Sequence, residues 1–282
     1  MDRGSPLRRR LSNMKIISRG LFVASFVGFA LGGEWNCADT SGAFELSTDC
    51  TMTDEVAVSG DLTVTGNETV YSTLIAASGK RHFKITSGAY TLRLKWLNLT
   101  GGDIASNSGD DRIGGSIFVK GVTAQLNISH CIFFKNNAYN GGAVSGQYGM
   151  PNLFFAHVLF ESNSATGDGG AIYLYVAKFE GESNIFKNNT AEINGGAMII
   201  QRGTSSSTDS LYVQNTGGET GGIFISGQLN DVLTQLDLTR VQLIENKQTL
   251  GSTWTSCGGV RTCFRYSSSL KVASSTSSSI ST

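Results

Sequence analysis

Two neighbouring carboxylates, Asp110 and Asp111, are the groups of this 282-residue sequence best suited by type and spacing to acid–base chemistry. A pair of carboxyl groups can serve as general acid and general base at a reacting bond. The pair nevertheless lies in a polar stretch between Leu99 and Gly114, which is typical of a solvated loop. We therefore predict no catalytic residues here, and expect the chain not to be an enzyme, with the enzyme alternative kept open.

The five cysteines predict disulfide bonds rather than a metal site. No C-x-x-C or H-x-x-x-H spacing occurs, so zinc is not expected. Cys37 and Cys50 are near neighbours in sequence, as are Cys257 and Cys263, and each pair is predicted to form a local disulfide. Cys131 is left over, and we expect it to be a small buried thiol. No metal and no cofactor is predicted.

The N-terminal 33 residues indicate export. A basic segment precedes the apolar run Leu21–Leu31, which ends in Gly32 and Gly33. This is the pattern of a secretory signal peptide, and the run is too short to span a membrane as a helix. An uncleaved anchor is the alternative. We predict a secreted or cell-surface protein with no membrane-spanning segment after cleavage, in a compartment where disulfides form.

The charge balance argues against a nucleic-acid partner. Lys and Arg number 22, as do Asp and Glu, and the signal peptide holds several of the basic residues. The exported chain is therefore mildly acidic, whereas nucleic-acid binding depends on a basic surface. The sequence is also rich in Gly (35) and poor in Pro (2), which favours short strands joined by glycine turns.

Three segments of the chain repeat one another, starting at Phe133, Phe160 and Phe186. Each has an aromatic residue at position 0, Asn at +3, Ala at +5 and a Gly-Gly pair at +8 or +9, and a fourth, weaker copy starts at Tyr212. The repeat residues are Phe133, Asn136, Gly141, Gly142, Phe160, Asn163, Gly169, Gly170, Phe186, Asn189, Gly195, Gly196, Tyr212, Asn215, Gly221 and Gly222.

The repeat predicts an all-β fold, a single-stranded right-handed parallel β-helix with coils of about 26 residues. Apolar residues alternate with period 2 before Phe133 and Phe160, as in Leu126 and Ile128, only in part before Phe186 and not before Tyr212. This alternation indicates short strands buried on one face. About three strands are expected in each coil. We predict a signal peptide at 1–33, an N-terminal cap at 34–60, the β-helix at 61–266 and a Ser/Thr-rich tail or truncated coil at 267–282.

The repeated residue types suit the inside of such a coil. Phe133, Phe160, Phe186 and Tyr212 are expected to stack as one interior column, with Leu99 and Leu243 at its ends. The asparagines at +3 are expected to form a ladder at a turn, and the glycine pairs to supply positive φ where the coil bends. On this interpretation every repeat motif is structural.

Other side chains become neighbours at coil spacing. A lyase would need carboxylates gathered around calcium together with a basic residue. Equivalent positions bring Glu161 next to Lys187, and Asp168 next to Asn140 and Asn194, which is too few carboxylates for such a cage.

The histidines and the sequons complete the candidate sites. His130 and His157 fall near one corner of successive coils, where a shared ligand site is the alternative to exposed turn residues. Four N-x-[ST] sequons start at Asn67, Asn98, Asn127 and Asn188, and period 2 predicts that Asn98 and Asn127 point outward. On an exported chain they are candidate glycosylation sites.

The pairing of F-x-x-N with G-G-A-[ILV] resembles the repeat of the chlamydial polymorphic membrane proteins. The two best copies are Phe160–Asn163 with Gly169–Ile172, and Phe186–Asn189 with Gly195–Met198. The resemblance covers roughly residues 92–260. It implies a pectin-lyase-like β-helix on a surface-exposed or secreted protein, with adhesion as the usual proposal.

A second, weaker resemblance concerns catalysis. The stretch Ser108–Arg112 resembles the paired-aspartate motif of polygalacturonases, which also use a Gly-His-Gly and an Arg-x-Lys. None of the three histidines, His82 included, is flanked by glycines, and no Arg-x-Lys follows.

These observations favour a non-catalytic secreted or cell-surface β-helix that serves in adhesion or in surface or matrix structure. Its partner would be a surface protein or a carbohydrate, and its coils could associate end to end. The alternatives are a polysaccharide-acting enzyme and a fragment of a larger membrane-anchored surface protein. A cluster of three or more carboxylates with Arg or Lys on one face would indicate the enzyme, and a tight cluster around Asp110 and Asp111 would overturn the non-catalytic interpretation; we expect none.

Overall fold

The computed structural model describes residues 32–227, 234–249, 260–263, 268–273, 276–277 and 280–281, and their side chains at 33–227 and 234–249. Most of the predicted signal peptide lies outside the described residues, as does Cys257 with the side chain of Cys263. In the part of the chain that is described, no helix is long and apolar enough to cross a membrane.

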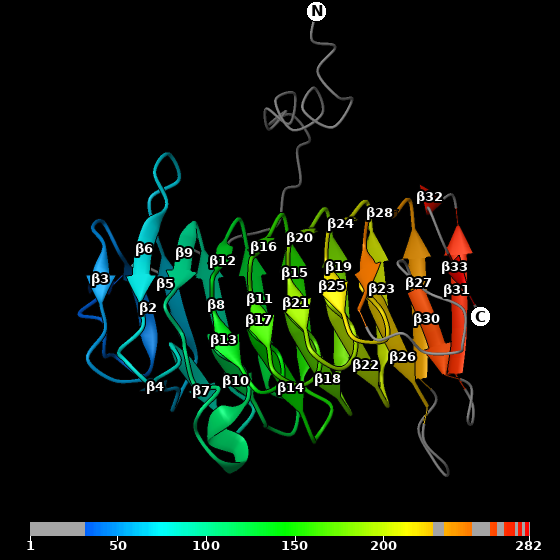
Figure 1. Cartoon of the computed structure of the whole chain (residues 1–282). Coiled ribbons are helices and arrows are strands. Elements are labelled where there is room, and N and C mark those ends of the chain that lie inside the picture. Colours follow the sequence, from blue (N-terminus) through cyan, green and yellow to red (C-terminus); the bar gives the residue numbers. More distant parts are fainter. Residues whose placement is uncertain are drawn as a thin grey trace, which may run out of the picture. The chain divides into compact units, whose positions relative to one another are not determined.

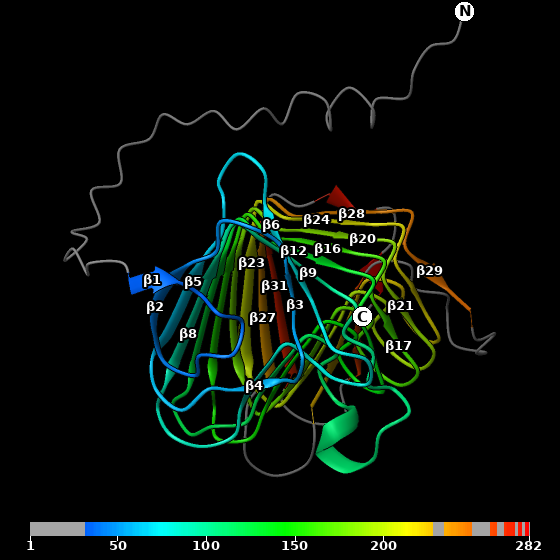
Figure 2. The ribbon, with the colours of Figure 1, turned by 90° about the vertical axis from the view of Figure 1, so that its left-hand side faces the viewer.

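The fold is a parallel β-solenoid, as the repeat predicted. Its strands form four sheets, and each complete coil contributes one strand to every sheet in turn (Figure 1). Seen along the solenoid, the strands of a sheet line up one behind another (Figure 2). We number the sheets 1 to 4 in the order in which a coil passes through them.

Sheet 1 has ten strands, in the order β1 (Gly32–Glu34), β2 (Gly42–Glu45), β5 (Leu62–Thr65), β8 (Thr91–Lys95), β11 (Gln125–Ser129), β15 (Asn152–Ala156), β19 (Lys178–Glu182), β23 (Thr204–Thr208), β27 (Thr234–Thr239) and β31 (Ser268–Ala273). Sheet 2 has nine, in the order β3 (Cys50–Thr51), β6 (Ser72–Ile75), β9 (Leu97–Thr100), β12 (Ile132–Phe134), β16 (Leu159–Glu161), β20 (Ile185–Lys187), β24 (Leu211–Val213), β28 (Gln242–Ile244) and β32 (Thr276–Ser277).

Sheet 3 has five two-residue strands, β13 (Asn137–Ala138), β17 (Ser164–Ala165), β21 (Thr190–Ala191), β25 (Thr216–Gly217) and β29 (Lys247–Gln248). Sheet 4 has nine strands, in the order β4 (Val56–Ala57), β7 (Phe83–Ile85), β10 (Ile117–Val119), β14 (Val144–Gln147), β18 (Ile172–Tyr175), β22 (Met198–Gln201), β26 (Ile223–Ser226), β30 (Val260–Cys263) and β33 (Ile280–Ser281). A complete coil thus holds four strands rather than the three expected, because the short sheet 3 separates sheets 2 and 4.

The coils are in register at the repeat. Phe133 pairs with Phe160, Phe160 with Phe186, and Phe186 with Tyr212. Leu99 pairs with Phe133 at one end of the column, and Leu243 pairs with Tyr212 at the other. Successive rings lie 5.0, 4.7 and 4.5 Å apart and within 7° of parallel, and all four side chains are fully buried. The column therefore lies inside the solenoid.

The buried asparagines at +3 form a hydrogen-bonded ladder. The Nδ2 groups of Asn136, Asn163 and Asn189 each donate to Oδ1 of the asparagine one coil further on, at 2.9–3.1 Å. The same Oδ1 accepts the backbone N–H of the preceding asparagine, as Asn163 Oδ1 does from Asn136 at 3.0 Å. Each Nδ2 also donates to a backbone carbonyl of the preceding coil, such as that of Phe133 for Asn163. A buried amide with all its hydrogen bonds made costs little to bury.

Non-glycine residues in the left-handed region make two of the corners. Between sheets 1 and 2 they include Trp96, His130 and His157, and between sheets 2 and 3 they include Ser162 and Asn188. The first residue of the Gly-Gly pair, at Gly141, Gly169 and Gly195, also has positive φ, as expected. A Cβ on the second glycine would collide with a carbonyl oxygen of the next coil. Glycine at this position therefore allows the backbones of two coils to approach closely.

The fourth repeat copy departs from the predicted register. Met198 pairs with Ile223, so Thr220, not Gly221, occupies the place of Gly195. The coil is one residue shorter at this turn than the sequence spacing indicated, and Gly221 and Gly222 are not equivalent to the earlier pairs.

The segment 34–60 stacks on the solenoid as an incomplete coil, since β2, β3 and β4 pair with β5, β6 and β7. The predicted disulfide between Cys37 and Cys50 is present, with the Cα atoms 6.4 Å apart. Cys131 is a free buried thiol, and burial raises its pKa to about 12. The described cysteines thus behave as predicted.

Candidate functional site: a charged cleft at Arg81

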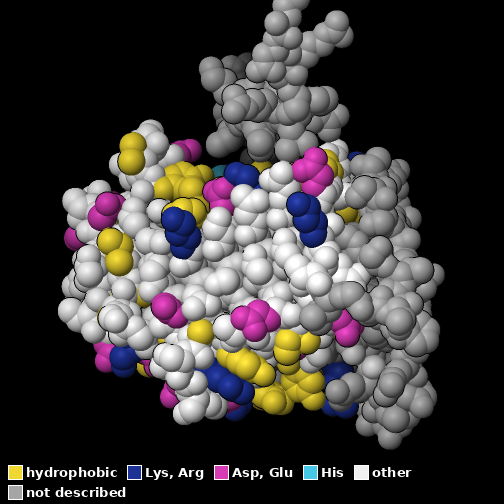
Figure 3. Space-filling view, viewed as in Figure 1, with side chains coloured by type: hydrophobic (Ala, Val, Ile, Leu, Met, Phe, Trp, Pro, Cys, Tyr) yellow, Lys and Arg dark blue, Asp and Glu magenta, His cyan; other side chains and the backbone are white. Residues whose placement is uncertain are grey.

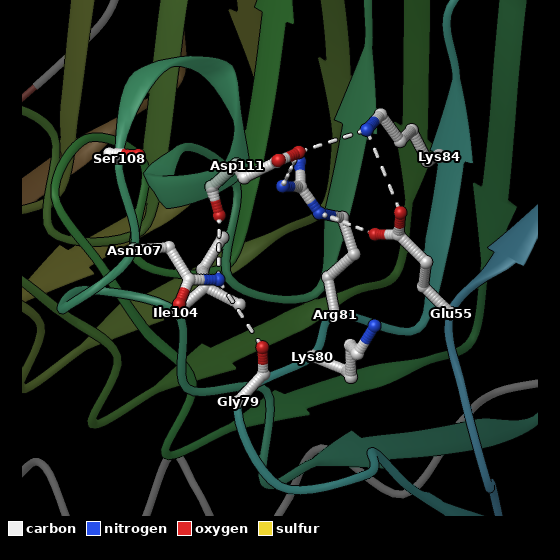
Figure 4. Close-up of a pocket in the computed structure, with 9 residues that line it drawn as sticks. All are labelled: Glu55, Gly79, Lys80, Arg81, Lys84, Ile104, Asn107, Ser108 and Asp111. Atoms are coloured by element: carbon white, nitrogen blue, oxygen red, sulfur yellow. Dashed lines mark hydrogen bonds and ion pairs between the residues drawn. The ribbon is translucent and has the colours of Figure 1, made fainter.

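A cleft of about 420 Å³ opens where the first coils meet a long loop (Figure 4). Glu55 directly precedes β4, Arg81 lies just before β7, and Lys84 is in β7. Asp111 comes from the short 3-10 helix η1 (Gly109–Arg112), which lies in the loop between β9 of sheet 2 and β10 of sheet 4. Because β4 and β7 are paired strands, side chains from two coils converge with the loop on one site.

Arg81 is the centre of the cleft. Its side chain is only 1 % exposed, and it donates to the backbone carbonyls of Ile113 at 2.7 Å and Asp110 at 3.2 Å. Its Nε lies 3.0 Å from a carboxylate oxygen of Glu55, at an angle unsuited to a hydrogen bond. The guanidinium also lies 5.2 Å from the ring centroid of Phe118. Arg81 thereby holds the η1 loop against sheet 4.

Carboxylates and cations alternate around Arg81. Lys84 Nζ lies 3.0 Å from Asp111 and 3.6 Å from Glu55, and Asp111 is also 3.6 Å from Arg81. At the rim, Lys80 pairs with Asp54 at 2.8 Å and Lys120 with Asp110 at 2.6 Å. The expectation that no such cluster surrounds Asp110 and Asp111 is therefore wrong.

The pairing decides what this cleft can do chemically. The hydrogen bond from Lys84, with the positive charges of Lys84 and Arg81, lowers the pKa of Asp111. A glycosidase acid needs a raised pKa so that it is protonated at neutral pH. Asp111 is instead held as a carboxylate. The arrangement is that of an ion-pair network which fastens the loop.

His82 lies next to the cleft but is fully buried. Its Nε2 lies 3.0 Å from the carbonyl oxygen of Leu74 and 3.1 Å from that of Thr100, and its Nδ1 lies 3.0 Å from Ser116 Oγ. Burial lowers its pKa to about 4. The neutral ring cross-links two neighbouring coils, since Leu74 lies in its own coil and Thr100 and Ser116 in the next, and it has no free nitrogen for a substrate.

The corner histidines do lie together. The ring centroids of His130 and His157 are 4.8 Å apart, and Trp96 continues the column at 6.4 Å from His130. His157 is exposed and His130 half-buried. Among the described residues no group of three His, Cys, Asp or Glu side chains could hold a metal ion.

The other predicted neighbours are also adjacent. Lys187 Nζ lies 2.6 Å from Glu161. Asn194 Nδ2 donates to Asp168 Oδ1, and the backbone N–H of Asp168 donates to Asn140 Oδ1, both at 2.9 Å. Burial raises the pKa of Asp168. These contacts tie neighbouring coils together and gather no cage of carboxylates.

The four sequons differ in exposure. Asn67 and Asn188 are exposed, whereas Asn98 and Asn127 are half-buried between buried strand neighbours, which places the latter two on the outward side. Asn67 Oδ1 accepts the backbone N–H of Thr69 at 2.8 Å and its hydroxyl at 2.7 Å. Oδ1 of Asn98 is buried without a hydrogen-bond partner.

Sequence reasoning missed Glu55, Arg81 and Lys84. They lie outside the recognisable repeats, and their approach depends on the pairing of Val56 with Phe83. The one available signal was the basic run Lys80–Arg81–His82 beside a strand, which alone indicates nothing about a partner.

The comparisons with known proteins bear on the repeat. Residues 157–175 match the family model described as the Chlamydia polymorphic membrane protein repeat. No curated protein and no solved structure matches the chain. The matched stretch runs through β16 and β17 to the end of β18 and includes Phe160, Asn163 and the Gly169–Gly170 turn. This chain therefore carries a repeat of the chlamydial polymorphic membrane protein type, folded as three of the four strands of one coil of a parallel β-solenoid.

Proposed function

We propose that this chain is a secreted or cell-surface, non-catalytic β-helix that presents its outer face for adhesion or for building a surface layer. The observation that carries this proposal is the burial of the repeat. The aromatic column, the asparagine ladder and the paired glycines all serve the interior or the turns. The repeat family is one of surface membrane proteins, which supports the location.

The outer face is consistent with presentation. It carries charges of both signs among uncharged polar side chains, with hydrophobic side chains along the lower edge of the view, where sheet 4 lies (Figure 3). Mixed polar surfaces with a local apolar patch are typical of contact surfaces.

Two measurements test the proposal. The full chain, tagged at its C-terminus and expressed in its own cells, is expected to reach the medium or to be labelled on intact cells, with an N-terminus near residue 34. Beads coated with the purified chain are expected to adhere to cells or to surface material more than beads coated with a heat-denatured sample. An intracellular chain, or equal adhesion by both samples, would contradict the proposal.

A polysaccharide-acting enzyme is the second candidate, because the cleft at Arg81 is lined by two carboxylates, Glu55 and Asp111, and by three cations. The wild-type chain and its Asp111→Asn variant would be incubated with pectin, polygalacturonate and neutral polysaccharides. Release of new reducing or unsaturated ends by wild type but not by the variant would establish the enzyme. We expect no release, since the carboxylates of the cleft are paired with cations.

A further inference from the structure

We infer that a strip of side chains beside sheet 4 is a binding site for a short segment of a neutral glycan. The strip, called here the tyrosine strip, consists of Lys120, Tyr148, Tyr175 and Arg202, which come from four successive coils. The inference rests on the proposed function, because it names the class of ligand that the presented surface holds.

The Tyr148 ring is exposed, the Tyr175 ring is half-buried, and both are held in place. Tyr148 is 48 % exposed, and its ring lies 5.1 Å from that of Tyr175, edge to face. Lys120 Nζ lies 5.3 Å from the Tyr148 ring centroid, and the Arg202 guanidinium 5.7 Å from that of Tyr175. Cations at this distance are attracted to aromatic faces, so the two rings are oriented before any ligand arrives.

The backbone makes a left-handed turn at Tyr148. Tyr148, Gly149 and Met150 all have positive φ, and Val176 and Arg202, which follow the paired strands of the next two coils, share the φ of Tyr148. Two hydrogen bonds to the next coil maintain it, from the N–H of Tyr148 to the carbonyl of Tyr175 and from Met150 to that of Val176. These hydrogen bonds fix the backbone that carries the exposed Tyr148 ring.

A second cleft of about 420 Å³ adjoins Tyr148. The side chains of Thr86 and Ser87 supply hydroxyls there, and Val122, 70 % exposed, supplies an apolar wall. Arg202 Nη1 donates to Tyr175 Oη at 3.3 Å, so donors and acceptors follow the rings. A flat ring beside hydroxyls and a guanidinium matches a pyranose, whose C–H face packs on an aromatic ring while its hydroxyls form hydrogen bonds.

The ion pair of Lys120 favours a neutral glycan over an acidic one at that end of the strip. Lys120, at one end of the strip, is already paired with Asp110 at 2.6 Å. Coils in a parallel sheet are spaced by ~4.8 Å, which is close to the length of one pyranose unit in an extended chain. Neighbouring sugars can therefore meet side chains from neighbouring coils.

The test measures binding of the full exported chain to cellohexaose, laminarihexaose and mannohexaose by titration calorimetry and by NMR of the sugar. At least one of these neutral glycans is expected to bind. Tyr148→Ala is expected to weaken that binding by about tenfold or more through loss of the stacked ring, whereas Tyr148→Trp keeps it. Phe154→Ala removes another exposed ring, on β15, and is expected to leave the affinity within about twofold.

Three results would overturn the inference: no neutral hexasaccharide binds, Phe154→Ala weakens binding as much as Tyr148→Ala, or oligogalacturonate binds more tightly than any neutral glycan. Thermal unfolding of each variant shows whether it is folded. If Tyr148→Ala does not fold, the test is the affinity of Tyr148→Trp for the glycan that wild type binds. The bead assay separates the two proposals. If Tyr148→Ala beads adhere like wild type, this inference fails while the proposed function stands; glycan binding without adhesion contradicts the proposed function alone.

Discussion

Phe160 is the residue whose environment is most completely set by the repeat. Its ring stacks between those of Phe133 and Phe186 at 5.0 and 4.7 Å and touches Phe155 edge to face. Neighbours from three coils thus enclose the Phe160 ring. None of them can fill its space without giving up its own packing contacts.

Phe160→Ala is therefore expected to lower the free energy of unfolding by ~3–5 kcal/mol, through lost burial and a cavity that does not collapse. Urea denaturation followed by circular dichroism measures this. Phe154→Ala, at a 40 % exposed position of β15, serves as the control and is expected to cost under ~1 kcal/mol. A decrease in the free energy of unfolding of less than ~1 kcal/mol for Phe160→Ala would show that the aromatic column contributes little to the stability of the core.

His82 should make the stability depend on pH. Burial lowers its pKa from 6.5 to about 4, so between these values the unfolded chain binds a proton that the folded chain refuses. The contribution of neutral His82 to the free energy of unfolding is therefore complete above about pH 6.5. It is lost as the pH falls to about 4, which lowers the free energy of unfolding by ~3 kcal/mol. Equilibrium unfolding across this window tests the effect. His82→Gln should reduce the difference in the free energy of unfolding between about pH 6.5 and about pH 4. His157→Gln, at an exposed corner, should leave that difference unchanged.

At the scale of elements, the strands near the N-terminus are joined covalently. The bond between Cys37 and Cys50 connects the segment after β1 to β3, across 13 residues, and lies beside the buried Trp35. A loop of this length restricts the unfolded chain by a modest amount.

Replacing both Cys37 and Cys50 by serine is expected to lower the free energy of unfolding by about 2–3 kcal/mol. The same change in wild type on adding a reductant, and none in the double variant, would assign the effect to the disulfide. An unchanged midpoint in both experiments would mean that β2 and β3 contribute nothing to cooperative unfolding.

The elements also show what sequence patterns reveal. The column and the ladder were predictable, because Phe and Asn recur at one spacing and identical side chains pack well on one another at coil distance. The corners were not, since Trp96, His130 and Ser183 share a left-handed φ but no side-chain type. The cleft at Arg81 was missed for a related reason: its members come from coils without the repeat, so nothing in the spacing aligns Glu55 with Lys84.

At the scale of the whole molecule, the solenoid is a stack in which the strands of each described coil pair with those of the coils before and after it. Stability in such a stack is approximately a sum over coils and their interfaces. The ladder spacing of 26 residues between Asn163 and Asn189 defines a unit that can be removed.

Deleting residues 159–184 joins Val158 to Ile185 and should place Phe186 directly on Phe133. We expect the shortened chain to keep its β circular dichroism and to melt at a lower temperature than wild type. Deleting residues 159–171 removes about half a coil and should abolish folding, because the column and the ladder then face different neighbours. Equal behaviour of the two deletions would contradict nearest-neighbour stacking.

The asparagine ladder has a further consequence for how such a chain can vary. Successive ladder residues are 27, 26, 26 and 31 positions apart, yet the hydrogen bonds between them keep the same length to within a few tenths of an ångström. Extra residues are therefore absorbed elsewhere in the coil, as the loop carrying η1 shows. A foreign peptide grafted into that loop would be displayed without disturbing the stacked coils. The solenoid is therefore suited to serve as a scaffold in which the loops vary in length and sequence while the asparagine ladder stays constant.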